Sequence, residues 1–156
     1  MKKKIIITGG LGYIGTELCK LYSGVSWNHQ LVVLDNRFIS ERVNQLRNWN
    51  MEFIQGDILN KDLVKKYCSG ADVVHHLAGV TEVPRTKTES SKEQDEKIKE
   101  VGVRGTQNIL DVINKKCKII FPSTHVVFEG INEVKTDIKE DDVTKPVLSY
   151  SSSKAL

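Results

Sequence analysis

The sequence has few of the residues that build disulfide frameworks or metal sites. Its 156 residues include only three cysteines, Cys19, Cys68 and Cys117, which are widely spaced and form no CxxC motif. Cysteines in this pattern are typical of reduced thiols packed in a protein interior. The four histidines show no metal-ligand spacing with them, so we expect neither a disulfide nor a bound metal.

The sequence also lacks an excess of one charge and a long apolar run. Lys and Arg number 23 against 20 Asp and Glu, a net charge of +3, and the two signs are interspersed. This balance does not indicate a nucleic-acid partner. The apolar run in the opening MKKKIIITGG is too short for a signal peptide or a spanning helix. We therefore expect no nucleic-acid partner, no membrane partner and a cytoplasmic location.

What is present is typical of one globular α/β domain covering residues 1–156. Hydrophobic residues make up 39% of the chain, and no repeat or linker interrupts it. The segments between the predicted strands are long enough for crossover helices, and Ile14, Leu18 and Tyr22 recur at helical spacing. The charged run at residues 86–97 is expected to be a solvated loop leading into a helix that continues to about residue 113. Five short runs predict the strands of a parallel sheet covered on both faces: residues 5–8, 31–35, 51–55, 72–77 and 118–121.

The first predicted strand runs directly into TGGLGYIG, in which Gly9, Gly12 and Gly15 have the spacing GxxGxxG. Gly9 permits a tight turn, Gly12 lets the backbone approach a pyrophosphate, and Gly15 allows the helix to pack closely on the strand. The helix N-terminus, where Tyr13 and Ile14 lie, supplies free N–H groups and a positive dipole. We therefore predict that this loop binds a dinucleotide.

A carboxylate follows at the position that a dinucleotide requires. Asp35 closes the second predicted strand, twenty residues after Gly15, where it can accept hydrogen bonds from the adenosine ribose hydroxyls, with Asn36 beside it. A carboxylate there repels a 2′-phosphate, which favours NAD, while Arg37 leaves NADP as the alternative. Loop and carboxylate together predict a Rossmann-type doubly wound parallel sheet.

Five motifs in order carry a resemblance to a known family: TGGLGYIG, GD at 56–57, HLAG at 76–79, PSTHVV at 122–127 and YSSSK at 150–154. They resemble the extended short-chain dehydrogenase/reductase family, the NAD-dependent epimerase/dehydratase group. The resemblance implies that Asp57 contacts adenine, with Ile58 beside it, and that Leu77, Ala78 and Gly79 run along the cofactor. For Asp57 the alternative is a helix N-cap before ILNKDLVKKY.

The resemblance also implies a catalytic set. Tyr150 is the general base, and Lys154 lowers its pKa from the reference value of ~10 and holds the nicotinamide ribose. Thr124 binds the substrate oxygen, with Ser123 as the alternative hydroxyl. Members with 4,6-dehydratase activity carry an Asp-Glu pair after the catalytic Thr, whereas His125 and a valine follow Thr124 here, which disfavours a dehydratase.

The predicted function is therefore that of an NAD-dependent nucleotide-sugar epimerase, acting by transient oxidation of a sugar carbinol. The alternatives are an NAD-dependent reductase or dehydrogenase of a non-sugar carbonyl or alcohol, and a non-catalytic dinucleotide-sensing module. Gly102 replaces an Asn common in the family, so any role of that Asn is in doubt. Family members often form homodimers, which is a further partner that the resemblance implies.

The position of YSSSK at the end of the chain leads to one more expectation. Only six residues follow Tyr150, whereas family members continue for about another domain that binds the substrate. We expect the chain to be the cofactor-binding portion of a larger enzyme, with the C-terminal substrate domain absent and little turnover in isolation.

Overall fold

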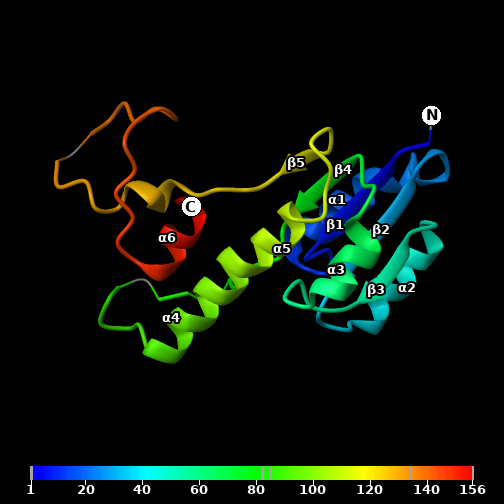
Figure 1. The fold of residues 1–156 in the computed structure, drawn as a ribbon, viewed down its shortest axis with the longest axis horizontal. Coiled ribbons are helices and arrows are strands. Elements are labelled where there is room, and N and C mark those ends of the chain that lie inside the picture. The colour runs from blue at the N-terminus through cyan, green and yellow to red at the C-terminus, as the bar shows by residue number, and fades with distance from the viewer. Residues whose placement is uncertain (1, 82, 85, 134, 156) are drawn as a thin grey trace. The chain divides into compact units, whose positions relative to one another are not determined.

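The computed structural model of the protein describes residues 2–81, 83–84, 86–133 and 135–155. The chain divides into two compact units (Figure 1). The first unit comprises Met1–Gly79 and Arg104–Pro122, and the second comprises Val80–Val103 and Ser123–Leu156. Within the described residues, no helix combines the length and hydropathy needed to cross a bilayer.

The first unit is built on a five-stranded parallel sheet with the order β3-β2-β1-β4-β5. In the central strands, Ile6 is in register with Val32 on one side and Val74 on the other. All five predicted strands are confirmed, as is the doubly wound parallel sheet. The strands are β1 (Lys4–Thr8), β2 (Gln30–Asp35), β3 (Glu52–Gln55), β4 (Val73–His76) and β5 (Lys118–Ile120).

Two adjacent histidines of β4 show how the helices cover the sheet. His75 Nε2 lies 2.8 Å from the hydroxyl of Tyr22 on one face, and His76 Nε2 lies 3.0 Å from Thr106 Oγ1 on the other. Burial, with the nearby charge of Lys118, lowers the pKa of His75, which favours the neutral ring. The helices of this unit are α1 (Tyr13–Ser23), α2 (Ser40–Asn48), α3 (Lys61–Cys68) and α5 (Thr106–Leu110), with a short 3-10 turn η1 (Ser26–Asn28).

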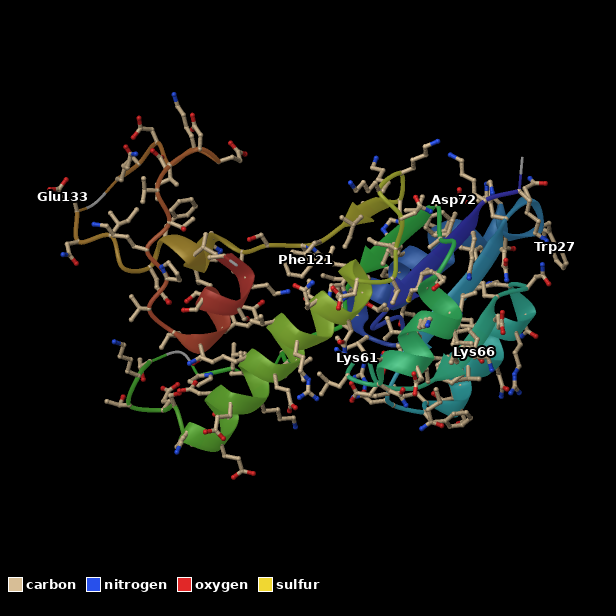
Figure 2. All side chains as sticks on the ribbon, viewed as in Figure 1. Trp27, Lys61, Lys66, Asp72, Phe121 and Glu133 are labelled. Atoms are coloured by element: carbon tan, nitrogen blue, oxygen red, sulfur yellow. The ribbon has the colours of Figure 1, made fainter. Side chains whose placement is uncertain are left out.

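On the α1 side of the sheet, the core is formed by alternate residues of β1 and β2. Ile5, Ile7, Leu31 and Val33 pack with buried residues of α1 and α2, whereas the intervening residues face the other side. α3 and α5 pack against each other, and α5 lies on the His76 face. Phe121, which follows β5 in Figure 2, stacks on the His76 ring with 5.5 Å between centroids.

The cysteines are free, as predicted. Cys19 and Cys68 are fully buried, and burial raises the pKa of Cys19 to about 12 and that of Cys68 to about 11. Both are therefore protonated packing residues.

The second unit contains α4 (Lys92–Lys99), a 3-10 turn η3 (His125–Phe128) and α6 (Ser149–Ala155). A π-helical stretch, η2 (Glu100–Gly105), continues from α4. α4 and α6 pack side by side in Figure 1. A Cβ at Gly102 would lie 2.9 Å from the Ser153 Cβ, so the glycine at this position permits close packing on α6.

The charged run at residues 86–97 is a loop that leads into a helix, as predicted. The helix begins at Lys92, because the Ser91 hydroxyl accepts the N–H of Gln94 (3.2 Å) and caps α4. The helical pattern predicted to about residue 113 ends earlier, at Leu110.

Candidate functional site

The predicted cofactor residues of the first unit all lie at the carboxyl ends of β1, β2, β3 and β4. β1 neighbours both β2 and β4, which makes it the point where the strand order reverses. Ligands of doubly wound sheets bind in the crevice outside this point. The topology therefore gathers at one edge of the sheet residues that lie up to 70 positions apart in the sequence.

The glycine loop after β1 depends on two glycines for its shape. Gly9 has a φ of +68°, and a Cβ there would lie 2.7 Å from the backbone N of Ala78. A Cβ at Gly15 would lie 2.5 Å from the carbonyl oxygen of Gly9. The tight turn predicted for Gly9 and the close packing predicted for Gly15 are thus both present.

The backbone amides of residues 9–12 already have acceptors inside the protein. Those of residues 9 and 10 donate to the Leu34 carbonyl (2.7 and 3.4 Å), and that of Gly12 donates to the Gly9 carbonyl (3.0 Å). The next amides, of Tyr13 and Ile14, begin α1 and have no acceptor within the helix. Their side chains are 85% and 61% exposed. The first turn of α1 is therefore the part of this loop that can receive an anion.

Asp35 anchors the glycine loop from the tip of β2. Its carboxylate, in a residue only 4% exposed, accepts the N–H of Leu11 at 2.9 Å. Arg42 of α2 donates to the Leu11 carbonyl and holds the same residue from the other side. The sequence analysis did not identify Arg42, because an arginine 31 residues from its acceptor gives no local pattern.

The Asp35 carboxylate also forms a hydrogen-bonded ion pair with the guanidinium of Arg37. Arg37 Nε lies 3.1 Å from Oδ1 and Nη2 lies 3.2 Å from Oδ2, and the hydrogen bond with Asp35 raises the pKa of Arg37. The guanidinium also faces the loop, since a Cβ at Gly12 would lie 3.7 Å from Nη2. Ribose hydroxyls that approach Asp35 must therefore share the carboxylate with Arg37 or displace it.

Asp57 after β3 joins this edge of the sheet through Asn36. Its Oδ2 accepts from the Asn36 amide at 3.2 Å, and its Oδ1 accepts the N–H of Leu59 at 2.9 Å. The alternative role as a helix N-cap is wrong, because Asn60 caps α3 by accepting the N–H of Leu63 at 3.1 Å.

Buried polar side chains that were not predicted as site residues hold the turn after β4 and the turn after β3. The Thr8 hydroxyl accepts the Ala78 N–H (3.2 Å) and lies 2.8 Å from His76 Nδ1. On α5, Asn108 donates to the Ile58 carbonyl at 2.9 Å. Polar residues inside an otherwise apolar strand were the available signal for Thr8 and His76.

The predicted catalytic residues all lie in the second unit. Tyr150 and Lys154 share one face of α6, with Lys154 Nζ 6.0 Å from the centre of the Tyr150 ring, and burial lowers the pKa of Lys154. Ser123 Oγ lies 3.5 Å from the Lys154 carbonyl, to which it donates. Thr124 caps η3, its hydroxyl accepting the Val126 N–H at 3.4 Å. Both candidate hydroxyls therefore lie on the segment beside α6.

No group of three or more His, Cys, Asp and Glu side chains suited to a metal ion occurs in the part of the chain that the structure describes.

Comparison with known proteins identifies the family. The sequence profile of the 3-beta hydroxysteroid dehydrogenase/isomerase family matches residues 6–156. The chain belongs to this family. The resemblance to the extended short-chain epimerases and dehydratases is thereby confirmed.

Three relatives of this family member are named for nucleotide sugars. The chain is 29% identical to dTDP-D-glucose 4,6-dehydratase from Dictyostelium discoideum over 98% of its length and 38% of that protein. It is 33% identical to CDP-paratose 2-epimerase from Salmonella typhi over 92% of its length and 44% of that protein. The crystal structure of UDP-glucose 4-epimerase from Brucella ovis in complex with NAD matches with 27% identity and a TM-score of 0.75, over 98% of this chain and 45% of that one.

These matches establish the cofactor of the family. NAD, the cofactor predicted from the sequence, is confirmed for the family. The chain spans less than half the length of each of these three relatives.

The packing of Gly15 predicts that Gly15→Ala disrupts the loop. Its Cβ would lie 2.5 Å from the Gly9 oxygen and 2.6 Å from the Gly10 Cα, so the helix or the loop must shift. We expect a loss of about 1–3 kcal/mol in the free energy of unfolding, measured by urea denaturation.

Gly24→Ala is the matched control. This glycine has a φ of −67°, and a Cβ added there would have nothing within 4 Å, so the substitution should leave stability unchanged or raise it by up to about 1 kcal/mol. Equal unfolding midpoints for the two variants would contradict the packing argument.

Proposed function

We propose that this chain binds NAD and carries the catalytic residues of a nucleotide-sugar epimerase. The observation that carries the proposal is the glycine loop anchored by Asp35, with its bound N–H groups at residues 9–12 and the free first turn of α1. Dinucleotide-binding sheets use this arrangement to receive a pyrophosphate beside a ribose-binding carboxylate. The names of the relatives support the substrate class.

In this proposal the first unit binds and orients the dinucleotide. The amides of Tyr13 and Ile14 receive the pyrophosphate, and Gly12 leaves room for it. Asp35, next to Asn36, accepts the adenosine ribose hydroxyls. The remaining contacts follow the predicted assignment, with adenine beside Asp57 and Ile58, and the turn of Leu77, Ala78 and Gly79 running along the cofactor.

The second unit supplies the proton chemistry of the proposal. NAD, held by the residues of the first unit, would supply reversible hydride transfer at the sugar carbinol. Tyr150 takes the hydroxyl proton and returns it when the carbonyl is reduced again, Lys154 holds the nicotinamide ribose, and Thr124, or alternatively Ser123, holds the substrate oxygen. His125 stands in place of the aspartate that follows the catalytic Thr of dehydratases, which favours epimerisation over loss of water.

A second candidate is an NAD-dependent dehydrogenase of a non-sugar alcohol. The family description, which names a hydroxysteroid dehydrogenase/isomerase, favours it. The two candidates differ in net redox change, since an epimerase returns its hydride whereas a dehydrogenase accumulates NADH.

The proposal predicts that Tyr150→Phe separates binding from chemistry. Loss of the general base should lower turnover by about 10²-fold or more in the protein that contains this chain. The affinity for NAD should change by less than about tenfold, because at most one hydrogen bond is lost. Isothermal titration measures the affinity, and absorbance at 340 nm with product analysis distinguishes epimerisation from net oxidation.

The control is Tyr67→Phe on α3, which removes a phenol outside the candidate site. Undiminished turnover of the Tyr150 variant would instead favour a dinucleotide-sensing module. Failure of the folded chain to bind NAD would reject the proposal as a whole.

Arg37 is expected to weaken the preference for NAD over NADP. Its guanidinium occupies the oxygens of Asp35 that the ribose would use, and its charge attracts a 2′-phosphate. Arg37→Gln should therefore tighten NAD binding by up to about fivefold, the range of an exposed ion pair, while weakening NADP binding. The ratio of the two dissociation constants is measured by titration.

Arg47→Gln, an exposed substitution in the last turn of α2, is the control and should leave this ratio unchanged. A ratio that moves toward NADP in the Arg37 variant would show that the guanidinium does not compete for Asp35.

A further inference from the structure

We propose that Glu129 is a positioning residue that holds the start of α6 and thereby places Tyr150. This inference rests on the proposed function, in which Tyr150 is the general base. α6 has only seven residues, fewer than the twelve or so that an isolated helix needs to be stable. Contacts from elsewhere in the second unit must therefore hold the helix.

Glu129 supplies those contacts on both sides of Tyr150 in the sequence. Its Oε1 accepts the N–H groups of Val147 and Leu148, each at 2.8 Å, directly before the helix. The same oxygen accepts a hydrogen bond from the hydroxyl of Ser151, the residue after Tyr150. Ser151 is fully buried, whereas Glu129 is exposed, so the contact joins a surface carboxylate to a buried hydroxyl. One carboxylate oxygen thus fixes three groups within the five residues that include Tyr150.

Backbone pairing reinforces this connection. The N–H of Lys145 donates to the Val127 carbonyl, and the N–H of Gly130 donates to the Lys145 carbonyl, both at 2.9 Å. The segment that contains Glu129 therefore lies against the segment that enters α6. Because η3 and Glu129 directly follow Thr124, the same contacts link the candidate hydroxyl to the candidate base.

The charge of Glu129 suits this role. Burial raises the pKa of Glu129, but the hydrogen bonds from Ser151, Leu148 and Val147, together with the charge of Lys87, outweigh it and lower the pKa overall. The side chain is therefore a carboxylate at neutral pH. A carboxylate accepts backbone N–H groups at a helix start more strongly than a neutral acceptor does.

The first test uses amide hydrogen exchange in this chain. Glu129→Ala removes the acceptor, so the amide of Val147 should lose protection, and that of Leu148, which also donates to the Ser151 hydroxyl at 3.2 Å, should lose part of it. Glu129→Gln keeps an acceptor oxygen and should retain part of the protection. Glu133→Ala, on the exposed loop labelled in Figure 2, is the matched control and should leave both amides protected. Unchanged protection in Glu129→Ala would overturn the proposal, whether or not the protein proves to be an epimerase.

The second test measures turnover and NAD affinity in the protein that contains this chain. Glu129→Ala should lower kcat by about tenfold to hundredfold, since small misplacements of a catalytic group have effects of this size. NAD affinity should fall by less than about tenfold, because the residues proposed to bind the pyrophosphate and adenosine lie in the first unit and α6 contributes at most the ribose contact of Lys154. Glu129→Gln should recover part of the loss, which a general loss of folding would not show.

The outcomes separate the two hypotheses. Full activity of Glu129→Ala alongside an inactive Tyr150→Phe would overturn the role of Glu129 and keep the proposed function. A fall in kcat without loss of protection at Val147 and Leu148 would also overturn it.

Discussion

The hydrogen bond from the Leu11 amide to the buried carboxylate of Asp35 is the interaction on which the candidate site depends. It joins the loop after β1 to the tip of β2 at 2.9 Å, and Arg42 holds the carbonyl of the same residue. With the amides of residues 9–12 thus satisfied within the protein, the free donors begin at the first turn of α1. The loop is preorganised, so an anion binding there need not order it.

The two units use the same physical device. In the first, Asp35 accepts a backbone amide and shapes the glycine loop; in the second, Glu129 accepts two backbone amides at the start of α6. Both segments are too short or too rich in glycine to hold their own shape. A carboxylate that accepts the N–H groups of such a segment holds its backbone in place. The side of the segment that faces a ligand stays unoccupied. The residues proposed for binding and those proposed for chemistry are thereby held by separate carboxylates.

Sequence patterns predicted those features that local chemistry determines. The strands followed from β-branched runs, and the glycine loop and Asp35 followed from spacing along one βαβ unit. The contacts of His76 with Thr8 and Thr106, of Asn108 with Ile58 and of Glu129 with α6 were missed, because their partners lie 18 to 68 residues away. The exact starts of two helices were not predicted, because they depend on which neighbouring polar side chain accepts the backbone N–H: Asn60 caps α3, and Ser91 caps α4 inside a charged run.

The central claim is that the first turn of α1 receives the pyrophosphate of NAD. The most direct measurement is a titration of the isotope-labelled chain with NAD, followed by amide chemical shifts. The account predicts saturable changes in the chemical shifts of the amides of Gly12, Tyr13 and Ile14. The amide shifts of the residues of α3 should change only slightly. Saturable binding whose shifts leave these three amides unmoved would contradict it.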